Sequence, residues 1–234
     1  MNTLNRNGSF SYPLEGGVDL QSIMRLVYVW MGLGLLLTAG VAFFTVSTPL
    51  INLVANPVIL LVAVIAEFGL VLGISFGFSR LSAGVAGILF FAYAALNGFT
   101  LSIVLLAFTA GSVVVAFVST AALFGAMSIL GYTTKVDLSK MGTFLMMGVL
   151  GLVIAMVVNM FVNSGPLDLL ISLAGVLIFT ALTAYDTQRI GRMAASMSAN
   201  GESATKFSIF GALRLYLDFI NMFLFILRLT GRRR

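Results

Sequence analysis

Cysteine and histidine are both missing from this chain. Without cysteine, the chain can form neither a disulfide nor a thiolate metal site. Without histidine, it lacks the commonest metal-binding side chain and the only one whose ordinary pKa lies near neutral pH. Any response to pH near neutrality must therefore come from a carboxylate or a lysine whose pKa is shifted by its surroundings.

Charge is also scarce, which excludes an ordinary soluble domain. Charged residues make up 9% of the 234 residues, against about 25% in a typical soluble protein. The net charge of +5 does not indicate nucleic-acid binding, because the basic residues cluster at the ends of apolar segments, as topology determinants do. The composition predicts a multi-pass protein whose main partner is the lipid bilayer.

Seven apolar segments can be drawn, each near the ~20 residues that a helix needs to cross the hydrocarbon core. Their expected limits are 25–47, 57–78, 83–106, 112–130, 142–163, 168–188 and 207–229. Pro49, Pro57 and Pro166 fall in or beside the breaks, where proline suits a helix end or start. The sequence predicts an all-α integral membrane domain over 25–230, with a polar cytoplasmic tail at 1–24 and a basic tail at 231–234.

Lysine and arginine in short loops predict the orientation. With a cytoplasmic N-terminus, the cytoplasmic ends hold Arg6, Arg25, Arg80, Lys135, Lys140, Arg189, Arg192 and Lys206, and the three opposite loops hold no Lys or Arg. The last three arginines oppose this, because seven full spans place them outside. Either the last segment re-enters without crossing, or the C-terminal tail is an exception.

Two carboxylates lie inside apolar segments, where ionisable residues are costly and tend to mark ion or proton pathways. Asp186 lies near the cytoplasmic end of segment six, and Asp218 lies in the cytoplasmic half of segment seven or near mid-depth. A short hairpin joins these segments, so they are expected to be antiparallel neighbours. The two carboxylates could therefore meet.

Helical spacing supports this pairing. Segment seven carries one polar stripe at steps of three and four, made of Gly211, Arg214, Asp218, Asn221, Phe225 and Arg228. Segment six has a face of small and polar residues, of the kind that membrane helix interfaces use, made of Ser172, Gly175, Phe179, Thr183 and Asp186.

Segment two supplies a candidate cation. Gly69, Gly73 and Gly77 form two overlapping GxxxG motifs, which predict a close-packing face, and Arg80 follows on the same face. Two close carboxylates cannot both ionise cheaply, so they are expected to share a proton. When the proton leaves, one carboxylate needs another partner, and Arg80 is the candidate.

Plainer interpretations stand beside this one. Arg214 could neutralise Asp218 from four residues away, Asp186 could be a solvated residue near a helix end, and Arg80 could only set topology. Glu67 lies on a different face from Arg80 and needs a polar neighbour or a proton. Asn97, Asn159 and Asn221 are the candidate neighbours.

No sequence motif supports an enzyme. The chain has no GxxxxGK[ST], HExxH, GxGxxG or GxSxG pattern. An intramembrane aspartyl protease would pair YD with GxGD. The first is present around Asp186, but Asp218 lies in YLDFIN. We expect no catalytic residues and no cofactor.

The chain resembles the Bax-inhibitor family of transmembrane Bax-inhibitor-motif proteins, in its bacterial branch. The resemblance is densest in MSILGYTTKVDLSKMG, TALTAYDTQRI and GALRLYLDFINMFLFILR. It implies an inner-membrane location and a seven-helix fold with the last helix central. It also implies a pH-sensitive calcium leak, with Asp186 and Asp218 as proton sensor and Arg80 as the latch for one aspartate. Glu67 matches a family glutamate only loosely, because its spacing to the arginine differs slightly.

Three functions remain open at this stage. The first is a calcium leak in which Asp186 and Asp218 are candidate calcium ligands, since calcium prefers oxygen ligands, with Glu67, Arg214 and Asn221 as candidates for the ion pathway or its support. The second is a non-conducting regulator that binds a membrane protease complex through helix faces and the GESA loop. A proton-coupled transporter ranks lower, because no convincing internal repeat is present.

Overall fold

The computed structural model describes residues 20–77, 80–196 and 201–232, which form helices and no strand. Seven of these helices are long and apolar enough to cross a membrane, as expected. The elements are α1 (Leu20–Val46), α2 (Ile51–Val54), α3 (Pro57–Gly77), α4 (Ala83–Ala107), α5 (Ala110–Thr133), a 3-10 turn η1 (Leu138–Lys140), α6 (Met141–Val162), α7 (Gly165–Ala195) and α8 (Gly201–Thr230).

Helices α1, α7 and α8 extend well into stretches expected to be tail or loop. Helix α1 begins at Leu20, inside the expected polar tail, because Ile23 and Met24 are buried there. Most of the expected loop between segments six and seven is helical, and the GESA residues form the first turn of α8. Within this expected loop, the side chains of Ile190, Ala194 and Ala204 are buried. An amphipathic pattern therefore continues along both helices beyond the point where the average hydropathy of the sequence falls. The short helix α2 was not expected.

Side-chain caps begin three of the long helices. The hydroxyl oxygens of Ser82, Thr109 and Ser164 accept backbone N–H groups from the first turns of α4, α5 and α7. Each satisfies one of the N–H groups that a helix start leaves without a partner. Helix α6 ends at Asn163, whose backbone is left-handed with φ 52°, a conformation that asparagine tolerates better than most residues.

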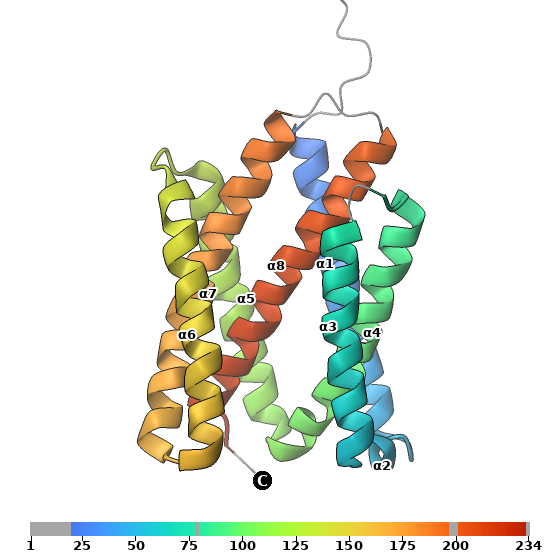
Figure 1. Cartoon of the computed structure of the whole chain (residues 1–234), viewed down its shortest axis with the longest axis vertical. Helices are drawn as coiled ribbons and strands as arrows, with labels where there is room; N and C mark the ends of the chain where they lie inside the picture. The colour runs from blue at the N-terminus through green and yellow to red at the C-terminus, as the bar shows by residue number, and fades with distance from the viewer. Residues whose placement is uncertain (1–19, 78–79, 197–200, 233–234) are drawn as a thin grey trace, which may run out of the picture.

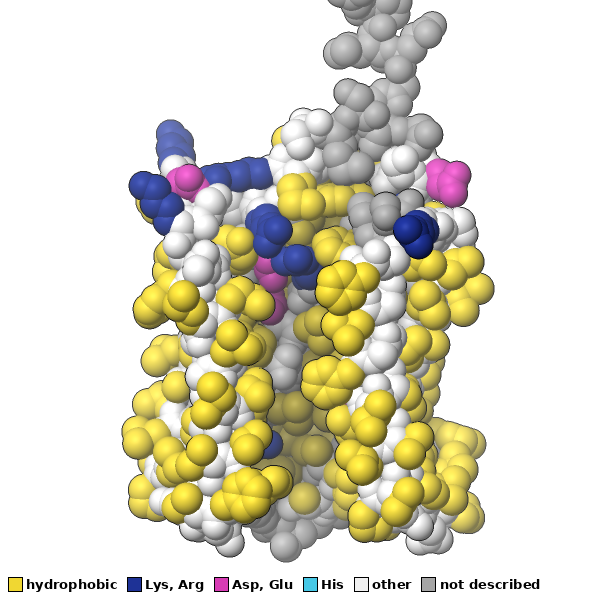
Figure 2. Space-filling model, in the orientation of Figure 1, with side chains coloured by type: hydrophobic (Ala, Val, Ile, Leu, Met, Phe, Trp, Pro, Cys, Tyr) yellow, Lys and Arg dark blue, Asp and Glu magenta, His cyan; other side chains and the backbone are white. Residues whose placement is uncertain are grey.

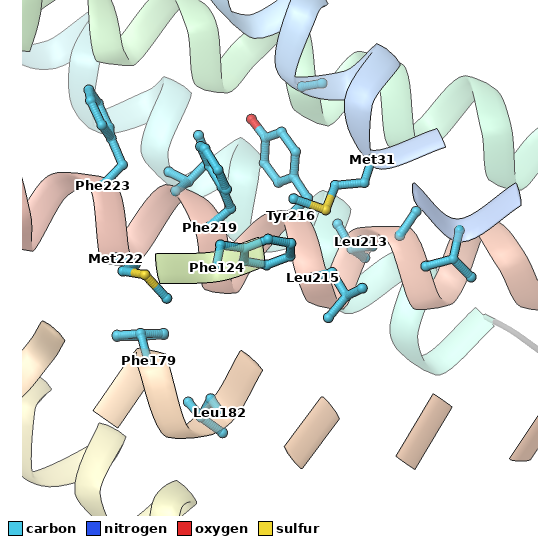
Figure 3. Close-up of a cluster of buried hydrophobic side chains, with 14 of the residues drawn as sticks. Met31, Phe124, Phe179, Leu182, Leu213, Leu215, Tyr216, Phe219, Met222 and Phe223 are labelled. Atoms are coloured by element: carbon cyan, nitrogen blue, oxygen red, sulfur yellow. The ribbon is translucent and has the colours of Figure 1, made fainter. Parts of the chain in front are cut away.

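Helix α8 is the centre of the bundle, as the family resemblance implies. It crosses the molecule diagonally behind α3 and α6 (Figure 1) and packs against α7, α1, α5 and α4. Met222 of α8 lies toward Phe179 and Leu182 of α7 (Figure 3), while Phe219 packs edge-on against Phe124 of α5. Close approach to α7 depends on Gly175, where an added Cβ would lie 2.5 Å from the Phe225 ring.

The outer surface of α3 contradicts the predicted glycine packing face. Gly69 and Gly73 are exposed, and a Cβ added at either would meet no atom within 4 Å. The helix instead packs against α4 with a different face, where Ala63 and Ile74 are buried. GxxxG spacing shows that close approach is sterically allowed, but it does not say which neighbour takes the surface.

The C-terminus settles the topology of the last segment within the bundle. Helix α8 is unbroken and ends at the opposite end of the bundle from the α7–α8 connection (Figure 1). There, the backbone N–H of Thr109 donates to the Arg232 carbonyl at 3.1 Å, and the Arg232 N–H donates to Ser112 Oγ at 2.9 Å. Arg232 therefore lies beside the Lys- and Arg-free α4–α5 connection, as an exception to the charge pattern. Arg6, Arg233 and Arg234 lie outside the described residues.

Candidate functional site

Helix α8 is exposed along one stripe from Phe210 onward. Within 210–228, the side chains that are not buried are Phe210, Arg214, Leu217, Asn221, Leu224 and Arg228, which recur at steps of three and four. Leu217, Asn221 and Leu224 of this stripe form the floor of a cleft of about 440 Å³ whose walls come from α3, α4, α6 and α7. Figure 2 shows the hollow face on, with acidic and basic side chains in its upper part.

The aspartate cluster consists of Asp186, Arg214 and Asp218. Arg214 Nη1 donates to Asp186 Oδ1 at 3.2 Å, joining α8 to α7. Asp218 is 4% exposed, is close enough to Asp186 for their charges to interact, and its Oδ2 has no hydrogen-bond partner among the described residues. The structure thus brings the two carboxylates together, and one of them holds the cation.

The partner of Arg214 corrects one interpretation from the sequence. The guanidinium forms its ion pair with Asp186 across the helix interface, not with Asp218 four residues along its own helix. Its side chain leaves α8 toward the cleft, where its guanidinium also lies 5.1 Å from the centre of the Phe210 ring. Asp186 is also buried, with 6% exposed, and is not a solvated residue at a helix end.

The predicted polar stripe of α8 is in fact two adjacent faces. Gly211, Asp218 and Phe225 are buried, whereas Arg214, Asn221 and Arg228 line the exposed stripe. Steps of three and four connect both sets, because the two faces lie only about 60° apart on a helix of 3.6 residues per turn. On α7 the predicted face is fully buried, as its small and polar composition suggested.

Arg80 is not engaged with the aspartate cluster. It is exposed and lies just beyond the end of α3, where its backbone N–H donates to the Gly77 carbonyl at 2.9 Å. No ion pair joins Arg80 to a carboxylate in the part of the chain that the structure describes. The nearest cations to Asp186 are instead Arg214 and Arg189, whose charges both act on it.

A second buried polar group, the glutamate cluster, consists of Thr38, Glu67, Asn97, Thr100 and Tyr216. Thr100 Oγ1 donates to Glu67 Oε1 at 2.6 Å, and Asn97 Nδ2 donates to Oε2 over a longer 3.5 Å. Tyr216 OH donates to Asn97 Oδ1 at 3.0 Å and lies 2.7 Å from Thr38 Oγ1. The cluster joins α1, α3, α4 and α8.

Sequence reasoning identified Asn97 as a neighbour of Glu67 but missed Thr100, Tyr216 and Thr38. Asn221 faces the same cleft, and its Nδ2 donates to the Leu217 carbonyl at 2.8 Å. Arg189 was assigned only to topology, although it follows Asp186 by three residues on one helix, a spacing that places neighbours on one side.

No group of three or more acidic side chains comes together among the described residues, whereas calcium takes six to eight oxygen ligands. The arrangement instead suits a proton or a passing cation, because a buried carboxylate oxygen without a hydrogen bond is satisfied by either.

Comparison with known proteins agrees with this architecture. Residues 20–234 match the family described as "Inhibitor of apoptosis-promoting Bax1". The chain belongs to the Bax inhibitor family. Among its relatives, the Escherichia coli "Inner membrane protein YbhL" is 44% identical over the whole of both chains. A Deinococcus radiodurans protein is 48% identical over 92% of each chain, and a Rickettsia prowazekii protein is 40% identical over all of this chain and 97% of that relative. This is a membrane protein of the Bax inhibitor family.

Proposed function

We propose that this protein is a pH-sensitive calcium leak channel of the bacterial inner membrane, with its N-terminus in the cytoplasm and no enzymatic activity. The observation that carries the proposal is the buried pair Asp186 and Asp218. Among the described residues, Asp186 has an ion pair with Arg214, whereas Asp218 has none and its Oδ2 accepts no hydrogen bond. The YbhL relative is named as an inner membrane protein, which supports the location.

The pair can act as a proton-dependent switch. Two buried carboxylates this close cannot both carry a charge cheaply, so they share a proton at low pH. When that proton leaves, Arg214 holds one charge and the other needs a new partner. Arg80 remains the candidate latch, and α3 would have to move to bring it to the cleft. Helix α3 is suited to this, because few of its residues are buried.

Calcium is the cargo of the proposed channel. The cleft offers oxygen atoms of Glu67, Asn97 and Asn221 at mid-depth, with Asp186 and Asp218 nearer one end. These are the hard ligands that calcium prefers. Too few of them converge to hold the ion for long, which suits conduction more than storage.

The test is calcium flux into liposomes that contain the purified protein and a calcium dye, at several pH values on each side. Wild type should leak faster as the pH rises, whereas Asp186→Asn and Asp218→Asn should lose that dependence. Arg80→Ala should lower the flux at high pH. Glu202→Gln, on an exposed first-turn residue of α8, is the matched acid-to-amide control. Flux that keeps its pH dependence in both aspartate variants would reject the proposal.

A second candidate is a non-conducting regulator of another membrane protein, such as a membrane protease complex. The exposed Gly69 and Gly73 favour it, because they offer a GxxxG surface for a helix of a partner. Under this candidate, Gly69→Leu and Gly73→Leu abolish co-purification of the partner, and a folded wild type shows no calcium flux above empty liposomes.

A further inference from the structure

The cleft over α8 opens sideways from the bundle. Its floor carries Leu217 and Leu224, and its two lips carry Phe68 of α3 and Val153 of α6. Phe68 is 68% exposed and Val153 is 47% exposed, so the lips continue into the apolar outer surface that faces hydrocarbon in a membrane. A long apolar opening of this kind, in a bilayer, is lined by acyl chains.

Two arginines whose charge is only partly neutralised lie near Asp186: Arg214, one turn before the cleft residue Leu217 on α8, and Arg189 on α7. Arg214 shares Asp186 with Arg189, and its side chain is 33% exposed. Arg189 is exposed and donates to the Tyr185 hydroxyl at 3.3 Å. It has no ion pair with a carboxylate in the described ranges. Each guanidinium has five N–H donors, so the two together can bind a further anion.

Arg189 lies on the side of α7 that faces α6 and α8. Around the α7 axis it lies between Asp186, which pairs with Arg214 of α8, and Tyr185, whose ring lies where a Cβ added to Gly142 of α6 would sit. Helices α6 and α8 both line the cleft. Arg192, one turn further, points elsewhere and pairs with Asp137.

We propose that the cleft binds one anionic phospholipid, with its phosphate on Arg189 and Arg214 and an acyl chain along Leu217 and Leu224. The dimensions agree. Arg214 to Leu224 is ten residues, or about 15 Å of helix, and one leaflet contributes about half of a 30 Å hydrocarbon core. Under the proposed orientation, the lipid comes from the cytoplasmic leaflet.

Charge selects the occupant. A zwitterionic lipid brings a cationic group to two arginines, whereas an anionic headgroup does not, and arginine binds phosphate through paired N–H donors. The phosphate also competes with Asp186 for Arg214. Lipid binding is thereby linked to the aspartate cluster, and loss of the Asp186 charge should tighten it.

Fluorescence quenching tests the proposal without reference to ion flux, so its failure and that of the calcium channel are distinguishable. Trp30 is the only tryptophan. Trp30→Phe with Leu217→Trp places the reporter in the cleft of the full chain in liposomes. Brominated phosphatidylglycerol should quench it at much lower mole fractions than brominated phosphatidylcholine. Arg189→Gln should weaken this preference about tenfold, whereas Arg192→Gln, with the same charge change on the same helix, should not.

Native mass spectrometry of the unmodified chain provides a second readout if the reporter variant does not fold. Phosphatidylglycerol should remain bound to wild type and to Arg192→Gln, be lost from Arg189→Gln, and be retained more strongly by Asp186→Asn. Inorganic phosphate should not displace the lipid, because phosphate has no acyl chain to make the apolar contacts with Leu217 and Leu224. Equal quenching by the two brominated lipids, or displacement by phosphate alone, would overturn the proposal.

Discussion

The glutamate cluster and the aspartate cluster both bind neighbouring helices to α8, but they differ in how well their polar atoms are paired. In the glutamate cluster, each side chain has at least one hydrogen bond to another member. In the aspartate cluster, Asp218 Oδ2 is buried without one. Buried polar networks that are fully satisfied rigidify a core, whereas an unsatisfied group marks a strained or functional position. We therefore expect the glutamate cluster to contribute to stability and the unpaired Asp218 to contribute to activity, whereas the Arg214–Asp186 ion pair stabilises the fold within the second cluster.

Removing Arg214 should have the largest effect on stability. Arg214→Met leaves the Asp186 charge buried without its ion-pair partner, and breaking a buried pair costs roughly 3–5 kcal/mol. Because Arg214 is partly exposed, we expect about 3 kcal/mol, measured by unfolding in mixed micelles. The loss should shrink as the pH falls, since protonation removes the uncompensated charge. The double variant with Asp186→Asn should recover most of it; no recovery would indicate that Arg214 acts through packing alone.

Removing hydrogen bonds from the glutamate cluster should have the next largest effect on stability. Asn97→Leu removes the acceptor of the Tyr216 hydroxyl and one donor to Glu67, at a cost of about 2 kcal/mol in the free energy of unfolding. Asn52→Leu, an exposed position in α2, is the control and should change little. Calcium flux per folded molecule should keep its pH dependence in Asn97→Leu. If that dependence disappears, the clusters are not separable in the way we expect.

Asp218→Asn should barely change stability, in contrast to Asn97→Leu. The substitution replaces the carboxyl that is proposed to share a proton with Asp186 by a neutral amide, and it breaks no hydrogen bond to Oδ2. We expect a change within about 1 kcal/mol, in the stabilising direction. The same unfolding experiment measures it. A loss as large as that of Asn97→Leu would place Asp218 among the structural residues.

The smallest effect on stability is expected for the exposed ion pair between Asp137 and Arg192, outside the bundle core. The N–H of Ser139 and then Arg192 lower the pKa of Asp137 to about 2. Because the folded pKa is depressed, this stabilisation is present above the unfolded pKa of about 4 and is lost as the pH falls through about 2. Arg192→Gln should raise the pKa only partway, since the Ser139 N–H remains. Carboxyl NMR titration would show it, and an unchanged pKa would mean that Ser139 acts alone.

The sequence predicted the seven helices and the meeting of Asp186 and Asp218, because long apolar runs and ionisable residues inside them are strong signals. It did not predict which helix Arg214 turns toward. Steps of three and four connect adjacent helix faces, and only the packing of α7 separates them. The outward direction of Gly69 and Gly73 was missed for a related reason. Small residues allow another helix to approach closely, but they do not determine which helix it is. Thr100 and Tyr216 carry no local signal, since both are ordinary residues of apolar helices.

The helix that forms the core follows the other six long helices in the chain. Until α8 emerges, the first six long helices surround no central element, and α8 has the lowest mean hydropathy of the seven. Its polar residues make independent insertion unfavourable, so partners for Arg214 and Asp218 must already be in place. A chain cut short before Tyr216 would lack the contacts that join α1, α4 and α7. Such a product would be a ready target for degradation, and it would also lack the backbone bonds of Arg232 to the α4–α5 connection.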